Sequence, residues 1–146
     1  MDNKLMTFEN AAFGKIRTLT IDGEPWFVAV DVCRALEIGN PTDAMRRLDA
    51  DERTLVSIEG ASNGLPVNAV NEPGLYTLIL GSRKPEAKAF KRWITHEVIP
   101  AIRKYGGYMT KSLLEQVLEN PNLIYEFARR MLEEQQKNER LRQELD

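Results

Sequence analysis

The sequence is poor in the residues that disulfide, metal and membrane chemistry require. Its 146 residues include one cysteine, Cys33, and one histidine, His96. A single cysteine cannot form an intrachain disulfide, which favours a reducing, cytoplasmic setting. No apolar run approaches the roughly 20 residues that span a bilayer, and the first fourteen residues lack the basic and apolar regions of a secretion signal. We therefore expect a protein that is neither secreted nor embedded in a membrane.

What the sequence does have is an ordinary globular composition with a local excess of positive charge. Hydrophobic residues make up 42% and charged residues 29% of the chain, which fits one domain with a core plus an appendage. The net charge of −2 conceals a basic segment, residues 83–104, which holds seven cations against two carboxylates. A partner attracted by charge would meet this segment first.

The first seventy residues have the spacing of short strands with a helical insertion. Strands are predicted over residues 13–21, 25–30, 54–58 and 67–70, and helices over 31–38 and 41–48. The first two strands are joined by Asp22-Gly23, a dipeptide typical of hairpin turns. In the second helix, Asn40 is suited to the N-cap and Pro41 to the first helical position.

The middle of the chain favours two further helices, of which the second is long, basic and amphipathic. The first, residues 73–80, is short and apolar. Pro85 opens the second helix and Gly106 ends it. Its apolar residues fall on one face, which we predict to be core: Ala87, Phe90, Ile94, Val98 and Ala101, with Trp93 at the margin. Pro100 lacks a donor and collides with the carbonyl of His96, so a kink is expected there.

From residue 111 the chain becomes a polar helical tail. Five apolar residues recur near the 3-4 spacing of a coiled coil: Ile124, Phe127, Met131, Leu141 and Leu145. Glu134 and Asn138 interrupt this seam, so a coiled coil would be weak in its middle. Because so polar a helix has no core of its own, we expect residues 111–146 to mediate self-association or linkage to a further domain.

The predicted fold class is α+β. We expect a small antiparallel sheet with several short helices and the long basic amphipathic helix, within a domain of residues 1–110. The C-terminal helical tail follows that domain.

Two motifs that suggest catalysis are incomplete. His96-Glu97 begins like the zinc-protease signature H-E-x-x-H, but Pro100 stands where the second histidine should be. Residues 60–64 match the nucleophile elbow G-x-S-x-G, which needs a strand, a sharp turn and a helix. Because residues 65–67 continue as a strand, a hairpin loop is predicted instead.

The motifs for calcium and phosphate binding are incomplete or do not occur. Residues 49–52 resemble the start of a calcium loop, but Arg53 and Thr54 stand where an acceptor and a glycine are needed, so a solvated turn is expected. Neither G-x-x-x-x-G-K-[ST] nor G-x-G-x-x-G occurs in the sequence. We predict a protein without catalytic residues, metal or cofactor.

The strongest binding pattern is a pair of helices with a tight turn, followed later by a basic helix. In a helix-turn-helix the second helix enters the major groove, while lysines and arginines elsewhere hold phosphates. The candidate residues for nucleic-acid or partner binding are Arg46, Arg47, Arg83, Lys84, Lys88, Lys91 and Arg92. Basic helix faces are also common as simple solvated surface, so this pattern leaves both readings open.

Several stretches occur in the order and spacing of a known domain: residues 26–32, 40–44, 71–76, 82–88 and 97–104. Over roughly residues 5–110 the chain resembles the Bro-N domain, which is found in phage and prophage antirepressors and in proteins of large DNA viruses of insects. The sequence V-I-P-A-I-R-K looks like a signature of that family, which accounts for Pro100. The resemblance implies a small α+β regulatory domain that is associated with DNA binding and lacks catalysis.

The expected function is therefore that of a prophage-type regulator in the cytoplasm of a bacterial host cell. It would bind DNA in transcriptional control and form a homo-oligomer through its tail. The alternative is an antirepressor that binds a phage or host repressor protein and removes it from its operator. The residues do not decide between the two, because a basic face attracts phosphates and acidic protein surfaces alike.

Overall fold

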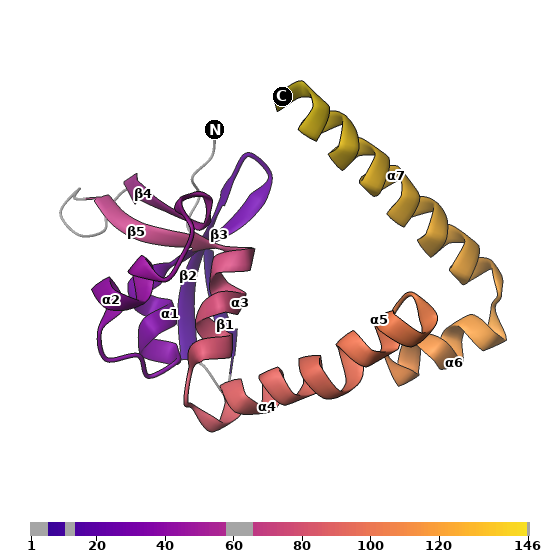
Figure 1. Ribbon diagram of the computed structural model, residues 1–146, viewed down its shortest axis with the longest axis horizontal. Coiled ribbons are helices and arrows are strands. Elements are labelled where there is room, and N and C mark those ends of the chain that lie inside the picture. The colour runs from indigo at the N-terminus through magenta and orange to yellow at the C-terminus, as the bar shows by residue number, and fades with distance from the viewer. Residues whose placement is uncertain (1–5, 11–13, 58–65, 146) are drawn as a thin grey trace. The chain divides into compact units, whose positions relative to one another are not determined.

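The computed structural model describes residues 6–10, 14–57 and 66–145 (Figure 1). The chain divides into two compact units, Met1–Val98 and Ile99–Asp146. The first unit combines a sheet with short helices and the second is helical, which confirms the predicted α+β class. The division that we predicted at residue 110 stays a prediction.

The sheet of the first unit is antiparallel and has five strands in the order β1-β2-β3-β5-β4. They are β1 (Met6–Asn10), β2 (Gly14–Ile21), β3 (Glu24–Val28), β4 (Arg53–Ser57) and β5 (Pro66–Asn71). Asp22 and Gly23 have φ angles of 52° and 80°, as a two-residue hairpin turn requires, and Ile21 pairs with Glu24. The predicted hairpin is confirmed, whereas β1 was missed.

Short helices follow the strands of this unit: α1 (Ala29–Ala35), α2 (Pro41–Arg46), a 3-10 turn η1 (Ala50–Glu52) and α3 (Glu72–Gly81). The predicted cap of α2 is present, because Asn40 Oδ1 accepts a hydrogen bond from the Asp43 amide at 3.1 Å. Asn71 caps α3 in the same way, accepting from the Gly74 amide at 3.0 Å. The turn at Asp49 is a capping box with Glu52, so the solvated turn is confirmed and has no calcium-loop form.

The core of the first unit lies on both faces of the sheet. The larger cluster packs α1, α2 and α3 on one face, with Val32, Cys33 and Ala44 fully buried. A smaller cluster includes Val28 and Ala69. Because Ala69 and its neighbour Val70 belong to different clusters, and successive strand residues point to opposite faces, β5 contributes to both.

A buried ion pair ties β2 to α1. Asp31 is 2% exposed, and its carboxylate accepts hydrogen bonds from the Arg17 amide, Nε and Nη2 at 2.9, 2.8 and 3.0 Å. Arg34 Nη2 lies 3.5 Å from Asp31 Oδ1. Burial pushes the pKa of Asp31 upward, but the hydrogen bonds from Arg17 and the charges of Arg17 and Arg34 outweigh it and lower that pKa.

The predicted basic helix comprises α4 (Pro85–Trp93), a π-helical turn η3 (Ile94–Val98) and α5 (Ile99–Tyr105). A π-helical turn stands directly before the segment in which a kink was expected, and the kink itself stays a prediction. The π turn precedes a proline that cannot donate to the carbonyl of residue 96 in α-helical geometry.

The apolar face of this helix is less buried than we predicted. In α4 only Ala87 is fully buried; Phe90 is half-buried and Trp93 is 38% exposed. The reason is that α4 packs mainly on one element, α3, and so lacks the second layer that would cover Trp93. Trp93, which the sequence placed at the margin of the core face, therefore lies at the surface.

The second unit consists of α5, α6 (Lys111–Glu119) and α7 (Asn122–Leu145), and α6 contacts α7. Thr110 Oγ1 accepts a hydrogen bond from the Leu113 amide at 3.2 Å and caps α6. No described helix is long and apolar enough to cross a membrane.

A candidate nucleic-acid interface

The seven predicted binding cations lie on two parts of the first unit. Arg46 and Arg47 are at the end of α2, Arg83 and Lys84 precede α4, and Lys88, Lys91 and Arg92 lie on α4. All are exposed except Lys84, which is half-buried. We call the exposed members of the second group, Arg83, Lys88, Lys91 and Arg92, the α4 cations.

The segment that starts α4 is anchored to the end of α1. Ser82 Oγ donates to the Leu36 carbonyl at 2.9 Å, and the Lys84 amide donates to Ser82 Oγ at 3.2 Å. Lys84 Nζ donates to the Ala35 carbonyl at 2.8 Å, where a cation complements the helix C-terminus. Lys84 therefore holds the helix in place, a role that sequence spacing did not reveal because its partner is 49 residues away.

The two arginines of α2 differ in their surroundings. Arg47 Nη2 lies 3.8 Å from Asp43 Oδ2, one helical turn earlier. Its Nη1 also lies 3.3 Å from the position that a Cβ on Gly81 would take, so the end of α2 is close to the end of α3. Arg46 has no carboxylate within ion-pair distance among the described residues. Of the pair, Arg46 carries the charge that is free to attract an anion.

The α4 cations are likewise uncompensated in the part of the chain that the structure describes, since none of them forms an ion pair there. Exposed charge without an internal partner is what phosphate contacts need, because each contact releases condensed counterions from the nucleic acid. The α4 cations are therefore available to attract an anion from solution.

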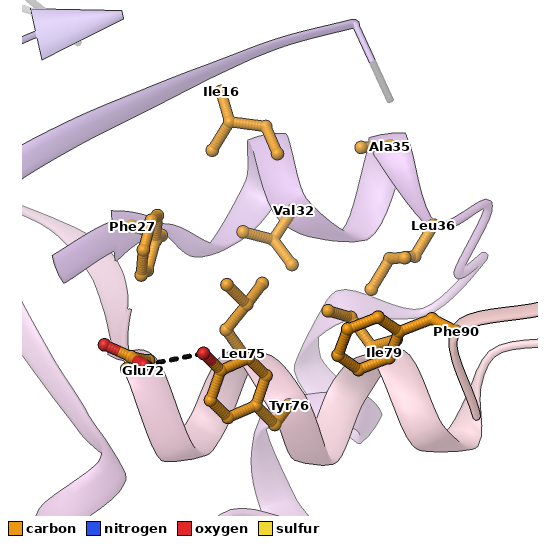
Figure 2. Close-up of a pocket in the computed structure, with 10 residues that line it drawn as sticks. All are labelled: Ile16, Phe27, Val32, Ala35, Leu36, Glu72, Leu75, Tyr76, Ile79 and Phe90. Carbon is orange, nitrogen blue, oxygen red and sulfur yellow. Dashed lines mark hydrogen bonds between the residues drawn. The ribbon is translucent and has the colours of Figure 1, made fainter. Parts of the chain in front are cut away.

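An apolar cavity of about 440 Å³ lies between α1 and α3. Figure 2 shows side chains of α1 and α3 pointing toward one another across it, with Phe90 at one end. Its single charged residue, Glu72, accepts the Tyr76 hydroxyl at 2.6 Å, which with burial raises the pKa of Tyr76 to about 12. The polar atoms at this site are thus bonded to each other.

An aromatic row continues from this cavity along α3 and α4. The Tyr76 and Phe90 rings are stacked with centroids 6.1 Å apart, and the Phe90 and Trp93 centroids are 5.8 Å apart. Tyr76, Leu80 and Trp93 are 41%, 41% and 38% exposed, and line a second cavity of about 560 Å³. Sequence reasoning missed this row because its members come from two helices.

The motifs weighed for catalysis have no supporting constellation among the described residues. There, no group of three or more histidine, cysteine, aspartate or glutamate side chains could hold a metal ion. His96 is exposed, and its Nδ1 lies 3.1 Å from the Arg92 carbonyl and 2.9 Å from Thr95 Oγ1. Residues 60–64 lie outside the described residues, although the strands that flank them, β4 and β5, are antiparallel neighbours.

Comparison with known proteins agrees with this fold. The family model for Bro-N, the N-terminal domain of the BRO family, matches residues 15–100. This class of domain is regulatory. The chain belongs to the BRO family through this N-terminal domain, and the resemblance drawn from the sequence is confirmed.

Curated relatives come from a bacterium and from large DNA viruses. An uncharacterized protein of Haemophilus influenzae is 38% identical over 89 residues, covering 59% of this chain and 43% of that protein. A Bro-N domain-containing protein of Invertebrate iridescent virus 3 is 29% identical over 119 residues, covering 66% of this chain and 29% of the viral one. The chain thus spans less than half the length of these two relatives. No solved structure gives a significant match.

Proposed function

We propose that this protein is a DNA-binding regulator of the phage or prophage type, which acts in transcriptional control without catalysis. The observation that carries the proposal is the set of α4 cations, which are exposed and unpaired within the described residues. Lys84 and Ser82 hold the start of their helix against α1, so the charges stand on a rigid support. Membership in a regulatory family supports the same reading.

The proposal makes DNA affinity strongly dependent on salt. The α4 cations, each neutralising one phosphate, contribute about −3 to −4 to the slope of log K against log salt concentration. Gel-shift titrations of the full chain on a mixed-sequence DNA duplex at several salt concentrations measure this slope. Affinity that stays flat with salt contradicts the electrostatic mechanism.

The triple variant Lys88→Ala, Lys91→Ala and Arg92→Ala locates the interface. It should lower the affinity by several orders of magnitude at low salt and make the slope shallower by about three. A matched control removes the same charge from the tail, by Arg130→Ala, Lys137→Ala and Arg140→Ala, and should bind normally. Equal losses in the two variants would show that net charge, and not this surface, attracts the DNA.

A second candidate function is the capture of a repressor protein. It is favoured by the exposed apolar residues Tyr76, Leu80 and Trp93, because apolar patches on a protein surface mark contacts with other proteins. Purification from the host, followed by identification of what accompanies the chain, distinguishes nucleic acid from a repressor. Under this alternative, Leu80→Asp should abolish binding of the repressor. In the gel-shift titration, the same variant should bind DNA with the affinity of the parent chain.

We further propose that the tail makes the protein a homo-oligomer. Along the predicted seam Ile124, Met131, Leu141 and Leu145 are 47%, 60%, 48% and 86% exposed, and Phe127 is half-buried. A second copy would remove these side chains from water. Light scattering should give at least a dimer for the full chain and a monomer for residues 1–110. A monomeric full chain contradicts this part of the proposal.

A further inference from the structure

A groove lined by both polar and apolar side chains lies between α2 and the two strands β4 and β5, and it includes none of the α4 cations. Its main cavity, of about 410 Å³, is lined by Thr42, Met45 and Arg46 of α2 and by Arg53, Thr54 and Asn68 of the strands. A cavity of about 280 Å³ adjoins it and shares Thr42, Met45 and Asn68. The two form one continuous depression, which we call the α2–β4 groove.

Two arginines from different elements line this groove. Arg46 projects from α2 and Arg53 from β4, and both are exposed. Neither forms an ion pair with a described carboxylate. The acidic residues of the preceding turn do not line the groove, and Glu52 is occupied by the Asp49 amide at 2.8 Å. The charge inside the groove is therefore positive.

The guanidinium of Arg53 is held in position before any ligand arrives. Its Nη1 donates to the Met45 carbonyl at 2.8 Å, so one of its five N–H groups is used and the others are left for a ligand. Met45 directly precedes Arg46, so the same segment of α2 orients one arginine and carries the other. A planar guanidinium fixed in this way suits the oxygens of a phosphate.

The remaining groups are neutral and can both donate and accept hydrogen bonds. Thr42, Thr54 and Asn68 line the groove, and the side chain of Asn68 forms no hydrogen bond with another described residue. Leu55, which pairs with Asn68 across the ladder, is 65% exposed at its edge. Fixed cations, neutral hydrogen-bonding groups and an apolar contact suit a DNA sugar–phosphate strand, which alternates anionic phosphates with deoxyribose rings that carry an ether oxygen and apolar C–H groups.

We infer that the α2–β4 groove is a second contact site for DNA, which binds one sugar–phosphate strand through Arg46 and Arg53. The inference rests on the proposed function, and it extends the interface from the α4 cations to residues of β4 and β5. A concave site lined by cations can receive a single strand, whereas a helix that enters the major groove must be convex. Arg47, which is paired with Asp43, takes no part.

The test compares three single variants on a mixed-sequence DNA duplex in salt titrations. Arg46→Ala and Arg53→Ala should each make the slope of log K against log salt shallower by about 0.9, because each removes one phosphate contact. Arg47→Ala is the matched control on the same helix and should leave the slope unchanged. Asn68→Ala should weaken binding at all salt concentrations without a change in slope.

The outcomes separate the inference from the function on which it rests. One outcome is a steep slope in the parent chain that neither Arg46→Ala nor Arg53→Ala changes. That result overturns the groove as a DNA contact site and leaves the proposed interface at the α4 cations intact. An effect of Arg47→Ala equal to that of Arg46→Ala also overturns it, because charge alone would then explain both. A parent chain that does not bind DNA overturns both proposals. Because Arg53→Ala also removes the hydrogen bond to the Met45 carbonyl, thermal melts must check that this variant folds. Arg46→Ala loses no such hydrogen bond, so its slope decides whether the groove binds DNA.

Discussion

The two units of the chain bury their apolar residues very differently. Of the seventeen buried hydrophobic residues among those described, sixteen belong to Met1–Val98 and one, Val117, to Ile99–Asp146. The first unit therefore has an internal hydrophobic core that stabilises it alone. The second unit depends on helix propensity and on whatever covers its exposed apolar side chains, because isolated helices are marginal in water.

Their ion pairs differ in the same way. In the first unit Asp31 is buried and bonded to Arg17, so its loss leaves an arginine without a partner inside the fold. In the second unit Arg129 reaches Glu126 at 2.9 Å and Glu133 at 2.7 Å, and all three are exposed or half-buried on one helix. Water replaces such exposed contacts readily. The comparison predicts a ranking of variants.

The largest effect is expected from the core of the first unit. Leu78 is 2% exposed, so Leu78→Ala should cost roughly 2–5 kcal/mol of unfolding free energy, since it removes buried methyl groups and leaves a cavity. Leu118 is 81% exposed in α6, and Leu118→Ala should leave the unfolding of the first unit unchanged. Both tryptophans belong to the first unit, so urea unfolding followed by their fluorescence reports on it alone. Equal costs for the two variants would break the comparison.

The next effect is expected from the ion pairs. Asp31→Asn should cost about 3 kcal/mol, the lower end of the range for a broken buried pair, because Arg17 is partly exposed and regains some water. Arg129→Ala in the tail should not shift the same unfolding curve. If Arg129→Ala lowered the unfolding free energy as much as Asp31→Asn, solvent exposure would not determine what an ion pair contributes to stability.

The pH dependence of stability sharpens this prediction. The pKa of Asp31 is lower in the folded protein than in the unfolded chain, so its stabilising contribution is fully present above the unfolded value of about 3.9. That contribution is lost as the pH falls through the depressed folded pKa. Acid titration of the unfolding free energy should therefore be steeper below about pH 4 in the parent chain than in Asp31→Asn. Parallel curves would contradict the assignment.

A smaller effect on the unfolding free energy is expected along α4, where the apolar side chains are less buried. Phe90 is half-buried between Tyr76 and Trp93, so Phe90→Ala should cost roughly 2–3 kcal/mol, less than a fully buried phenylalanine. Trp93 is 38% exposed, and Trp93→Ala should cost about 1 kcal/mol. Thermal melts followed by circular dichroism measure both. A greater cost for Trp93→Ala would mean that its ring is covered in solution.

The smallest effects are expected from exposed charges and from His96. The triple variant of Lys88, Lys91 and Arg92 and the single His96→Ala should each change the unfolding free energy by less than about 0.5 kcal/mol. Melting temperatures of the folded proteins check this, and DNA-binding assays on the same samples separate stability from function. Loss of binding in His96→Ala, with normal binding in the triple variant, would show that the helix works through its histidine.

Much of the fold was predictable because its signals are local. The hairpin at Asp22-Gly23, the cap at Asn40 and the irregularity before Pro100 each depend on a few adjacent residues. β1 was predictable in principle, since Met6 and Phe8 alternate with polar Thr7 and Glu9. The predicted burial of the α4 apolar face went too far for another reason. Periodicity identifies an apolar face, but it does not say how much of that face another element covers.

The candidate site was only partly predictable. The sequence identified the cations, but it treated all seven as equivalent. Arg47 is compensated by Asp43, which a spacing of four residues could have indicated. Arg53 was not identified at all, because it is brought to the α2–β4 groove by a strand and carries no basic neighbours in the chain.

The sequence by itself determined the elements, the caps, the position of the basic helix and the family, since all of these follow from side chains that lie a few residues apart. Only the tertiary structure decided which charges are available. Arg17 is bound to Asp31 across 14 residues and Lys84 to Ala35 across 49, while Arg46 and Arg53 are brought to one groove by different elements. The physical reason is that a charge is neutralised or left free by the groups within a few ångströms of it, and chain folding chooses those groups without regard to their distance in sequence.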